Sequence, residues 1–510
     1  MPTYLSPGVY VEEVSSGSKP IEGVGTSVAA FVGFAEKGPL NQPTLVTNWT
    51  QYAQVFGDFV ENSYLASAVY GYFLNGGGSA YIVRLDRPEA APRTTASSCA
   101  TATLVDAAGT PVLHARAAQA GPAGEELSLL VEAASEAGED LFKLTIARNG
   151  TPVENFDNLS LRKGNAHATA VVRRRSQTII LEQPAGAPAT APATGATPLL
   201  GTPAAARAAL SPSDFIGDAL ARTGLSSLEA VDDVTMLCVP DLMAALEQGL
   251  IDREGVKAVQ LAMTAHCELM ADRVAILDTP PGLNAQQVRD WRVDEAGYDS
   301  KYGALYWPWV KVNDPLAGKG QFIPPSGHIA GIWARSDETR GVHKAPANEA
   351  VRGSLALELA ITRREHDLLN PLGVNCIRVF PGQGIRVWGA RTLSSDPEWR
   401  YLNVRRLFNF VEESILQGTN WVVFEPNDPK LWDSVKRTIT MFLRGVWRDG
   451  ALFGRAPEDA FYVKCDEENN PQEGRDQGIL TVEVGIAAVK PAEFVVFRIS
   501  QFSDGASLDE

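Results

Sequence analysis

The segment Glu493–Phe502, which reads EFVVFRISQF, decides how the rest of the chain is interpreted. Its apolar residues fall on both faces of an extended backbone: Val495, Phe497 and Ile499 on one face, and Phe494, Val496 and Phe502 on the other. A strand that is apolar on both faces is typical of a buried position in a sheet, and it would aggregate if left uncovered. It is therefore either the central strand of its own domain or a strand that pairs with a partner chain.

The residues before this segment contain two amphipathic helices. The apolar positions at helical spacing are Val404, Leu407, Phe408, Val411 and Ile415 in the first helix, and Leu431, Val435, Ile439, Phe442 and Val446 in the second. Asp428 and Pro429 are suited to the N-cap and the first turn of the second helix. Together with the strands that follow, these helices predict an α/β domain over residues 371–490.

Two strands complete this predicted domain. Phe461–Cys465 is one candidate, and Leu480–Ile486 is the other. In the second candidate, Leu480, Val482 and Val484 alternate with polar or small residues, which is the pattern of a half-buried strand. Lys490-Pro491 then interrupts the chain, so residues 491–510 are predicted to form a separate C-terminal arm.

The second amphipathic helix also has a largely basic side. Asp433, Arg437, Thr440, Arg444 and Arg448 fall opposite its apolar stripe. This side is either a solvated surface or a docking surface for an acidic partner, to which arginine can make bidentate contacts.

The opposite end of the chain is a second predicted arm, residues 1–20. Leu5–Val14 reads LSPGVYVEEV, and it has strand formers, among them Val9, Tyr10 and Val11, after a Pro-Gly turn. Ser15–Lys19 has the composition of a flexible link. The chain thus has a candidate free strand at each end.

Between the arms, strands alternate with helices over residues 21–87 and 213–370, which predicts a layered α/β body. Val28–Phe34 and Arg273–Leu277 are examples of buried strands, Tyr302–Val312 is predicted as one further strand, and Pro346–Leu369 as a helical segment. Residues 88–212 interrupt this pattern with short strand-like runs and form a predicted β-rich surface insertion. Within it, Ala185–Pro203 has the low complexity of a linker.

Composition excludes several classes of function. The 510-residue chain has a net charge of −16, which argues against nucleic acid as a partner because phosphate binding needs a basic footprint. No signal-like segment or membrane-length apolar run is present, so we expect a protein made and kept in the cytoplasm without membrane insertion. The five scattered cysteines indicate neither a disulfide framework nor a zinc site.

The strongest enzymatic alternative is an α/β nucleotide hydrolase that uses Asp278, which ends the buried strand in ILDTPPG. That activity requires a phosphate-binding loop, and Gly318-Lys319-Gly320 lacks both the upstream glycine and the following hydroxyl. Glu365-His366-Asp367 has the residue types of an acid/base cluster, but neighbours on a helix point in different directions. We therefore predict no catalytic residue, cofactor or metal. A third alternative is a surface-binding module carried by the insertion.

Several short motifs together resemble the contractile tail sheath family, which includes phage tail sheaths, R-type pyocin sheaths and sheaths of extracellular contractile injection systems. They are SPGVYVEE at Ser6–Glu13, NPLGVNCIRV at Asn370–Val379, VWGARTL at Val387–Leu393, the run Arg405-Arg406-Leu407, FEPN at Phe424–Asn427 and GALFG at Gly450–Gly454. The order of these motifs and the length of the chain agree with that family.

The resemblance implies a structural subunit that polymerises as a helical tube around an inner tube and contracts to drive it through a target envelope. It implies that both arms add strands to the C-terminal domains of neighbours, with Leu480, Val482 and Val484 in the receiving sheet. Arg437, Arg444 and Arg448 are the predicted inner-tube contact. The implied partners are identical subunits, the inner tube, and the baseplate and tail-end cap proteins of a phage-tail-like particle.

Overall fold

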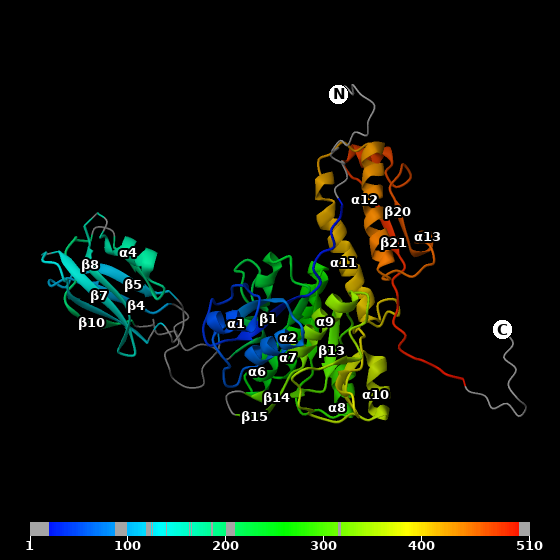
Figure 1. The fold of residues 1–510 in the computed structure, drawn as a ribbon, viewed down its shortest axis with the longest axis horizontal. Coiled ribbons are helices and arrows are strands. Elements are labelled where there is room, and N and C mark those ends of the chain that lie inside the picture. Colours follow the sequence, from blue (N-terminus) through cyan, green and yellow to red (C-terminus); the bar gives the residue numbers. More distant parts are fainter. Residues whose placement is uncertain are drawn as a thin grey trace, which may run out of the picture. The chain divides into compact units, whose positions relative to one another are not determined.

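The computed structural model describes residues 20–86, 99–118, 124, 126–138, 140–162, 164, 166–184, 187–199, 210–314 and 318–498. The chain divides into two compact units. The first, here called the C-terminal domain, contains the described residues among 1–26, 336–345 and 401–510, and the second, the body, contains residues 27–335 and 346–400. Each unit is described by itself (Figure 1).

A nine-stranded sheet organises the body. In spatial order its strands are β16 (Glu349–Ala350), β19 (Gly384–Val387), β18 (Val374–Phe380), β13 (Gly303–Trp307), β12 (Val274–Asp278), β11 (Met236–Cys238), β1 (Val28–Phe34), β3 (Ser79–Leu85) and β2 (Thr44–Val46). The strands from β18 to β3 run parallel, and antiparallel strands close both edges. β1, β11, β12 and β13 are almost wholly buried, which explains their continuous apolar sequences.

The helices of the body connect and cover these strands. They are α1 (Trp49–Phe56), α2 (Leu65–Asn75), α5 (Pro212–Ile216), α6 (Asp241–Glu247), α7 (Arg253–Met270), α8 (Ala285–Asp290), most of α9 (Ser326–Arg340) and α10 (Arg363–Leu369). Short turns of 3-10 or π-helix lie at Gly224–Ala230, Trp291–Ala296 and Asn370–Leu372. This alternation confirms the predicted mixed α/β class.

Two predictions within the body are wrong in their detail. Tyr302–Val312 is not one strand, because the backbone leaves the large sheet at Trp307 and re-forms as β14 (Val310–Asp314) in a three-stranded sheet with β15 (Lys319–Ile323) and β17 (Ala356–Leu357). Pro308 supplies the reason, since it lacks the N–H that a central strand needs.

Pro346–Leu369 is likewise not a single helical segment. Only α10 is helical there, and the residues before it contribute the short strands β16 and β17. Gly353 lies between these strands with φ of +80°, a left-handed conformation that ends regular structure and that glycine adopts without strain.

The insertion has a core of its own. One sheet contains β4 (Thr101–Val105), β5 (Pro111–Ala117) and β9 (Ile179–Glu182), and the other contains β10 (Gly195–Pro198), β6 (Leu127–Ala133), β7 (Leu141–Arg148) and β8 (Thr151–Ser160). α4 (Ala168–Arg175) follows β8 and contributes Ala168 and Val172 to the buried cluster. The prediction of a β-rich insertion is confirmed.

Within the low-complexity stretch Ala185–Pro203, the described residues 187–199 form more than a linker. β10 pairs antiparallel with β6, and Leu199 is buried in the core of the insertion. An edge strand is held by backbone hydrogen bonds and needs few apolar side chains, so composition alone underestimated the order of this segment.

The C-terminal domain is built on two long helices, α11 (Leu402–Gly418) and α12 (Pro429–Arg448), which lie side by side with the β20–β21 hairpin next to α12 (Figure 1). β20 (Phe461–Lys464) and β21 (Glu483–Ile486) pair antiparallel. Shorter elements are η4 (Asn420–Val422), α13 (Pro457–Ala460) and α14 (Gln472–Asp476). The two predicted helices and their apolar stripes are confirmed, including Asp428 as the N-cap, which accepts a 2.9 Å hydrogen bond from the Leu431 N–H.

The start of the C-terminal domain differs from the predicted position at residue 371. β18 and β19 complete the nine-stranded sheet of the body, and the chain passes into the C-terminal domain for the last time at Tyr401. Residues 20–26 and 336–345 belong to this unit as well. A buried ion pair joins the three segments, because Arg406 contacts Asp337 through two hydrogen bonds, the Nη1–Oδ1 bond measuring 2.8 Å, and donates a 3.0 Å bond to the Thr26 carbonyl oxygen.

Candidate functional site

The predicted C-terminal arm begins directly after the β20–β21 hairpin and is strongly exposed. The Tyr401 hydroxyl donates to Glu493 Oε2 at 3.2 Å. Beyond that bond, Phe494, Val495, Val496 and Phe497 have exposed fractions of 67–83%. Four consecutive exposed apolar residues form a surface that soluble chains normally cover. Ile499 and Phe502 lie outside the described residues.

Among the described residues, the hairpin beside this arm has two strands. Val463 of β20 is buried against the domain core, whereas Tyr462 on the opposite face is exposed. The same core is contacted by three half-buried residues, Leu480, Val482 and Val484. The observed strand β21 begins at Glu483, so it is shorter than the predicted strand Leu480–Ile486. A two-stranded sheet is marginal by itself, and its outer edges carry backbone groups that a further strand can pair with.

The N-terminal residues that were predicted to pair with such a sheet, Val9, Tyr10 and Val11, lie outside the described residues. The described chain begins at Pro20, and Ile21 is part of the apolar core of the C-terminal domain.

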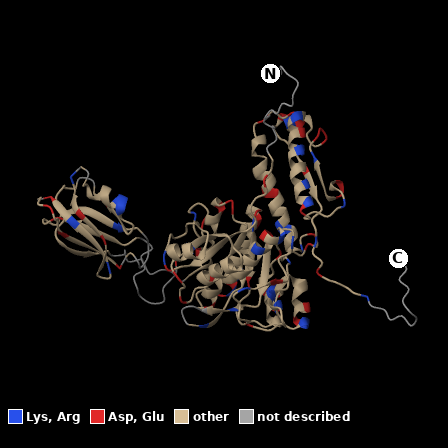
Figure 2. Cartoon of the chain, viewed as in Figure 1, with Lys and Arg blue, Asp and Glu red and all other residues tan. Residues whose placement is uncertain are grey.

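The basic side of α12 is present as predicted. Arg437, Arg444 and Arg448 are all exposed, while the opposite stripe of the helix is buried. Figure 2 shows lysine and arginine residues, in blue, at several places along α12. The structure adds two exposed lysines to this side of the molecule, Lys430 and Lys436, which the helical pattern could have identified. A cationic helix on a chain of net charge −16 is suited to an acidic partner.

A loop between η4 and α12 carries an exposed aromatic residue that the sequence did not single out. Phe424 is fully exposed and has a φ of +68°, a left-handed conformation that is rare for a bulky residue. Val423 beside it is also exposed. Phe424 belongs to the FEPN motif, but a motif does not reveal which of its side chains points outward.

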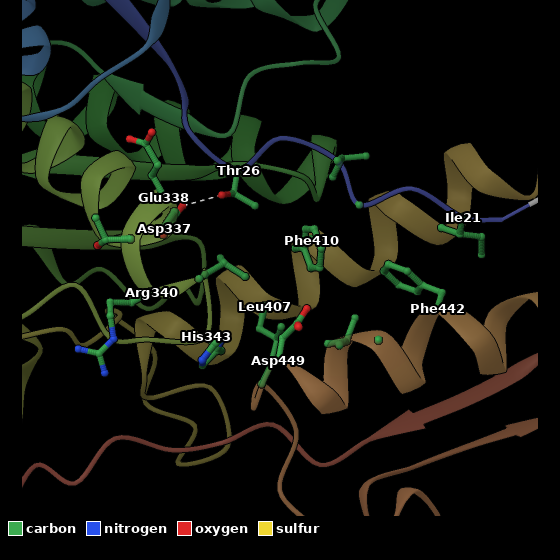
Figure 3. A pocket seen from close by; sticks show the side chains of 18 of the residues that line it. Ile21, Thr26, Asp337, Glu338, Arg340, His343, Leu407, Phe410, Phe442 and Asp449 are labelled. Carbon is green, nitrogen blue, oxygen red and sulfur yellow. Dashed lines mark hydrogen bonds between the residues drawn. The ribbon is translucent and has the colours of Figure 1, made fainter.

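A groove opens in the same domain (Figure 3). Leu407 and Phe410 of α11 and Met441, Phe442 and Gly445 of α12 form its apolar part. Its polar rim includes Glu338, Arg340 and Asp449. The groove has a volume of about 840 Å³ and lies within the C-terminal domain.

Asp278, the centre of the enzymatic alternative, is held inside the protein. Its side chain is 3% exposed, and Oδ1 accepts a 2.9 Å hydrogen bond from the Ser326 N–H at the start of α9. Burial raises the pKa of this carboxyl to about 7. Lys319, from the candidate phosphate loop, lies instead in the antiparallel strand β15. Neither residue is placed to bind a nucleotide.

The position where an open α/β sheet usually binds a ligand is also filled. Strand order reverses between β1 and β11, and ligands typically bind at the carboxyl ends of such strands. Here the buried Asp241 carboxylate accepts hydrogen bonds from the backbone N–H groups of Phe34 and Tyr64 and from the Ser63 hydroxyl, at 2.5 Å for Phe34 and 2.9 Å for Ser63. Asp241 is the first residue of α6, and its side chain fills this position from within by connecting the end of β1 to the start of α2.

The remaining candidate acid/base group has a structural role. The Glu365 carboxylate accepts a 2.8 Å hydrogen bond from the Thr362 N–H and caps α10. Those N-terminal bonds lower the pKa of Glu365. Among the described residues, no group of histidine, cysteine, aspartate or glutamate has an arrangement that could hold a metal ion. The helices in that same part of the chain also include none that could span a membrane.

Comparison with protein families identifies the class. The model of the phage tail sheath protein central domain matches residues 222–393, and the model of the phage tail sheath C-terminal domain matches residues 394–502. The two matches run without a gap and together cover more than half of the chain.

Individual relatives agree with this result. The tail sheath protein of Burkholderia phage BcepMu is 25% identical over 511 residues, which cover 96% of this chain and 95% of the relative. Other matches are partial: the chain covers 36% of the tail sheath protein of Vibrio phage KVP40, at 24% identity, and 61% of a putative prophage major tail sheath protein of Pseudomonas aeruginosa, at 27% identity. These partial matches span 46% and 48% of this chain.

Solved structures share the fold over the whole chain. The helical sheath of the anti-feeding prophage in its contracted state has a TM-score of 0.61 at 24% identity, with 98% of this chain and 100% of that chain covered. The sheath complex of the PVC extracellular contractile injection system, also contracted, has a TM-score of 0.59 at 23% identity, with 99% of each chain covered.

The family matches and the shared fold define the class, a structural protein. The chain belongs to the phage tail sheath protein family. It is a sheath subunit and not an enzyme, and the hydrolase alternative is unsupported.

Proposed function

We propose that this chain polymerises with identical copies into a helical tube around an inner tube, and that the polymer contracts to drive the inner tube through a target envelope. Contraction requires two packings of rigid bodies that stay connected by flexible strands. A head-to-tail contact that does not close on itself produces such a helical tube. The free energy for contraction is stored when the extended polymer assembles, so no bond has to be hydrolysed.

The single observation that carries this proposal is the exposed segment Phe494–Phe497 beside a two-stranded sheet. Ordering a ten-residue arm costs about 10–20 kcal/mol of backbone entropy. Backbone hydrogen bonds return about 1 kcal/mol each, so the arm is ordered only where its apolar side chains, worth about 1.5–3 kcal/mol each, are buried as well. The edge of a sheet in a neighbouring subunit supplies both the backbone hydrogen bonds and the burial of the apolar side chains.

Strand exchange at both ends follows from the same reasoning. We assign Phe494–Ile499 and residues 9–11 to the exchanged strands, and the β20–β21 sheet, with Leu480, Val482 and Val484 on its inner side, to the receiving site. The arms then tether neighbouring subunits while the folded domains move.

Electron microscopy of the purified chain tests the exchange. The full chain is compared with a variant that ends at Pro491 and with the double variant Val495→Asp and Phe497→Asp, and Arg498→Asp is the matched control because it leaves the apolar faces intact. We expect tubes or rings from the full chain and the control, and monomers from the other two. If all variants polymerise alike, the C-terminal arm is not the joint. If even the full chain forms no polymer with tube protein present, the sheath proposal fails.

The basic side of α12 is proposed to contact the inner tube. Three exposed arginines on one helix side favour an acidic surface, and Arg437, Arg444 and Arg448 span about 17 Å along the helix at its rise of 1.5 Å per residue. Reversing all three charges is expected to leave sheath polymers intact and to abolish co-assembly with the tube in a sedimentation assay. Normal assembly on the tube would refute this assignment.

The remaining partners follow from the kind of particle. One matching structure is the baseplate of the anti-feeding prophage, with a TM-score of 0.59 to this chain. We propose that the sheath begins on a baseplate, ends at a cap protein and is assembled in the bacterial cytoplasm as part of a phage-tail-like particle.

A further inference from the structure

Phe424 lies in a turn and is fully exposed. The Glu425 N–H donates a 3.1 Å hydrogen bond to the Val422 carbonyl oxygen, and Phe424, with φ of +68°, occupies the position of positive φ in this turn. Glycine or asparagine usually takes that position, so a bulky aromatic residue there is uncommon. A fully exposed aromatic side chain that a closed turn projects from the domain is suited to bind a partner.

Hydrogen bonds on its C-terminal side fix the loop that presents Phe424. The Trp432 indole N–H donates to Asn427 Oδ1 at 2.7 Å, and Asn427 Nδ2 donates to the Ile479 carbonyl oxygen at 3.0 Å. The N-cap bond of Asp428 then attaches the loop to the first turn of α12. The aromatic ring is therefore a preorganised projection, which lowers the entropy cost of docking.

The groove at the other end of α12 has the shape and the chemistry to receive an aromatic ring. Its apolar lining includes Leu407, Phe410 and Met441, and Met441 is 58% exposed. Gly445 lies inside α12, where alanine would stabilise the helix, and a Cβ atom placed there would meet no atom within 4 Å. A glycine without a neighbour in the monomer leaves room for the close approach of another chain.

The projection and the groove cannot meet within one chain. Both are attached to α12, and Pro429 and Met441 are separated by about 18 Å along the helix. We infer that Phe424 of one subunit inserts into the Leu407–Phe410–Met441–Gly445 groove of a second copy of this chain. A projection and a groove at different places on one rigid domain make a head-to-tail contact that propagates.

Charges beside the two features support a second copy as the occupant. Glu425 follows Phe424 and is exposed, and the groove rim carries the exposed Arg340. Lys430 lies on the loop side and is matched by Glu338 and Asp449 on the rim. Each surface thus carries exposed charges of both signs that the other surface can neutralise. This inference rests on the proposed polymerisation and adds a specific contact to it.

Mixed cysteine variants test the contact directly. Chains with Phe424→Cys are assembled with chains carrying Met441→Cys, so that a disulfide joining these two positions can form only between copies. In the control mixture, Leu269→Cys, 72% exposed on α7, replaces Phe424→Cys. We expect covalent dimers in the first mixture and at most about a fifth of that yield in the control. Equal yields of covalent dimer in the two mixtures would overturn the inference. So would the absence of covalent dimer when the cysteine variants assemble into tubes like those of the wild-type chain.

A charge exchange provides an independent test that does not require cysteine. Glu425→Arg and Arg340→Glu should each raise the concentration needed for polymerisation about fivefold, and the double variant should return it to within about twofold of the wild-type value. Circular dichroism of the monomers checks that both exposed sites tolerate the change. If the double variant does not recover the wild-type concentration for polymerisation, this contact is refuted but the proposed sheath function is not. If the wild-type chain never polymerises, the proposed function itself is refuted.

Discussion

Replacing Asp337 with alanine should loosen the C-terminal domain at the point where residues 20–26 join it. The carboxylate lies against Arg406, both side chains are 4% exposed, and the Thr26 hydroxyl donates to Asp337 Oδ2 at 2.7 Å. The Asp337→Ala change removes the Asp337 counter-charge while the Arg406 guanidinium remains buried. Removing one partner of a buried ion pair costs about 3–5 kcal/mol. The loss should fall on α11, which carries Arg406, and on the root of the N-terminal arm.

Hydrogen exchange followed by mass spectrometry is the suitable assay, because unfolding of a multidomain chain is not a single two-state transition. At about 1.4 kcal/mol per factor of ten, the exchange of amides in α11 should accelerate by a factor between about one hundred and several thousand. The control is Arg253→Ala, which removes the exposed pair with Glu295 and should cost less than about 1 kcal/mol. An Asp337→Ala variant whose α11 peptides exchange no faster than those of the control would refute the reasoning.

Two further predictions concern buried titratable groups of the body. Burial raises the pKa of Asp278 to about 7 from its usual 3.8, so the folded state binds the proton more tightly. Wild-type stability therefore falls as the pH rises from about 4 to 7, and Asp278→Asn should remove about 2–4 kcal/mol of this loss. If the two proteins show the same pH dependence of amide protection in β12, the prediction is contradicted. Burial lowers the pKa of His328 to about 4, so the contribution of this group to stability is full above pH 6.5 and is lost as the pH falls toward 4. His328→Gln should reduce this loss of stability at acidic pH. An unchanged loss would exclude His328 as its source.

The sequence predicts elements well where one face is buried and the other is exposed. α12 is an example, because its apolar stripe and N-cap are both visible as patterns and both are confirmed. Pattern fails for α9, in which every residue from Ser326 to Ala334 is buried, so no polar face alternates with an apolar one. Gly327 and Gly331 lie so close to α2 that an added Cβ would be 2.3 Å from its carbonyl oxygens, and glycine also lowers helix propensity.

Of the three candidate interaction surfaces, one could be predicted from the sequence and two could not. The basic side of α12 could be predicted because helical periodicity fixes which side chains share a face. Phe424 could not, since its exposure depends on a left-handed backbone conformation and on the Asn427 bridge between segments distant in sequence. The groove was equally invisible, because it joins residues from α11, α12 and the segment that follows Arg335. Tertiary contacts, and not local propensity, create these features.

The C-terminal domain combines a rigid core with an uncovered segment, and there is a physical reason for this combination. A contracting polymer without catalysis has to transmit force through packing, so the parts that carry load must be rigid while the joints remain extendable. The buried Arg406–Asp337 pair and the α11–α12 core provide rigidity, whereas Phe494–Phe497 stay uncovered in the single chain. An arm that folded onto its own domain would satisfy its apolar residues there and would have nothing left to bind a neighbour. The proposed strand exchange therefore depends on the exposure of that arm.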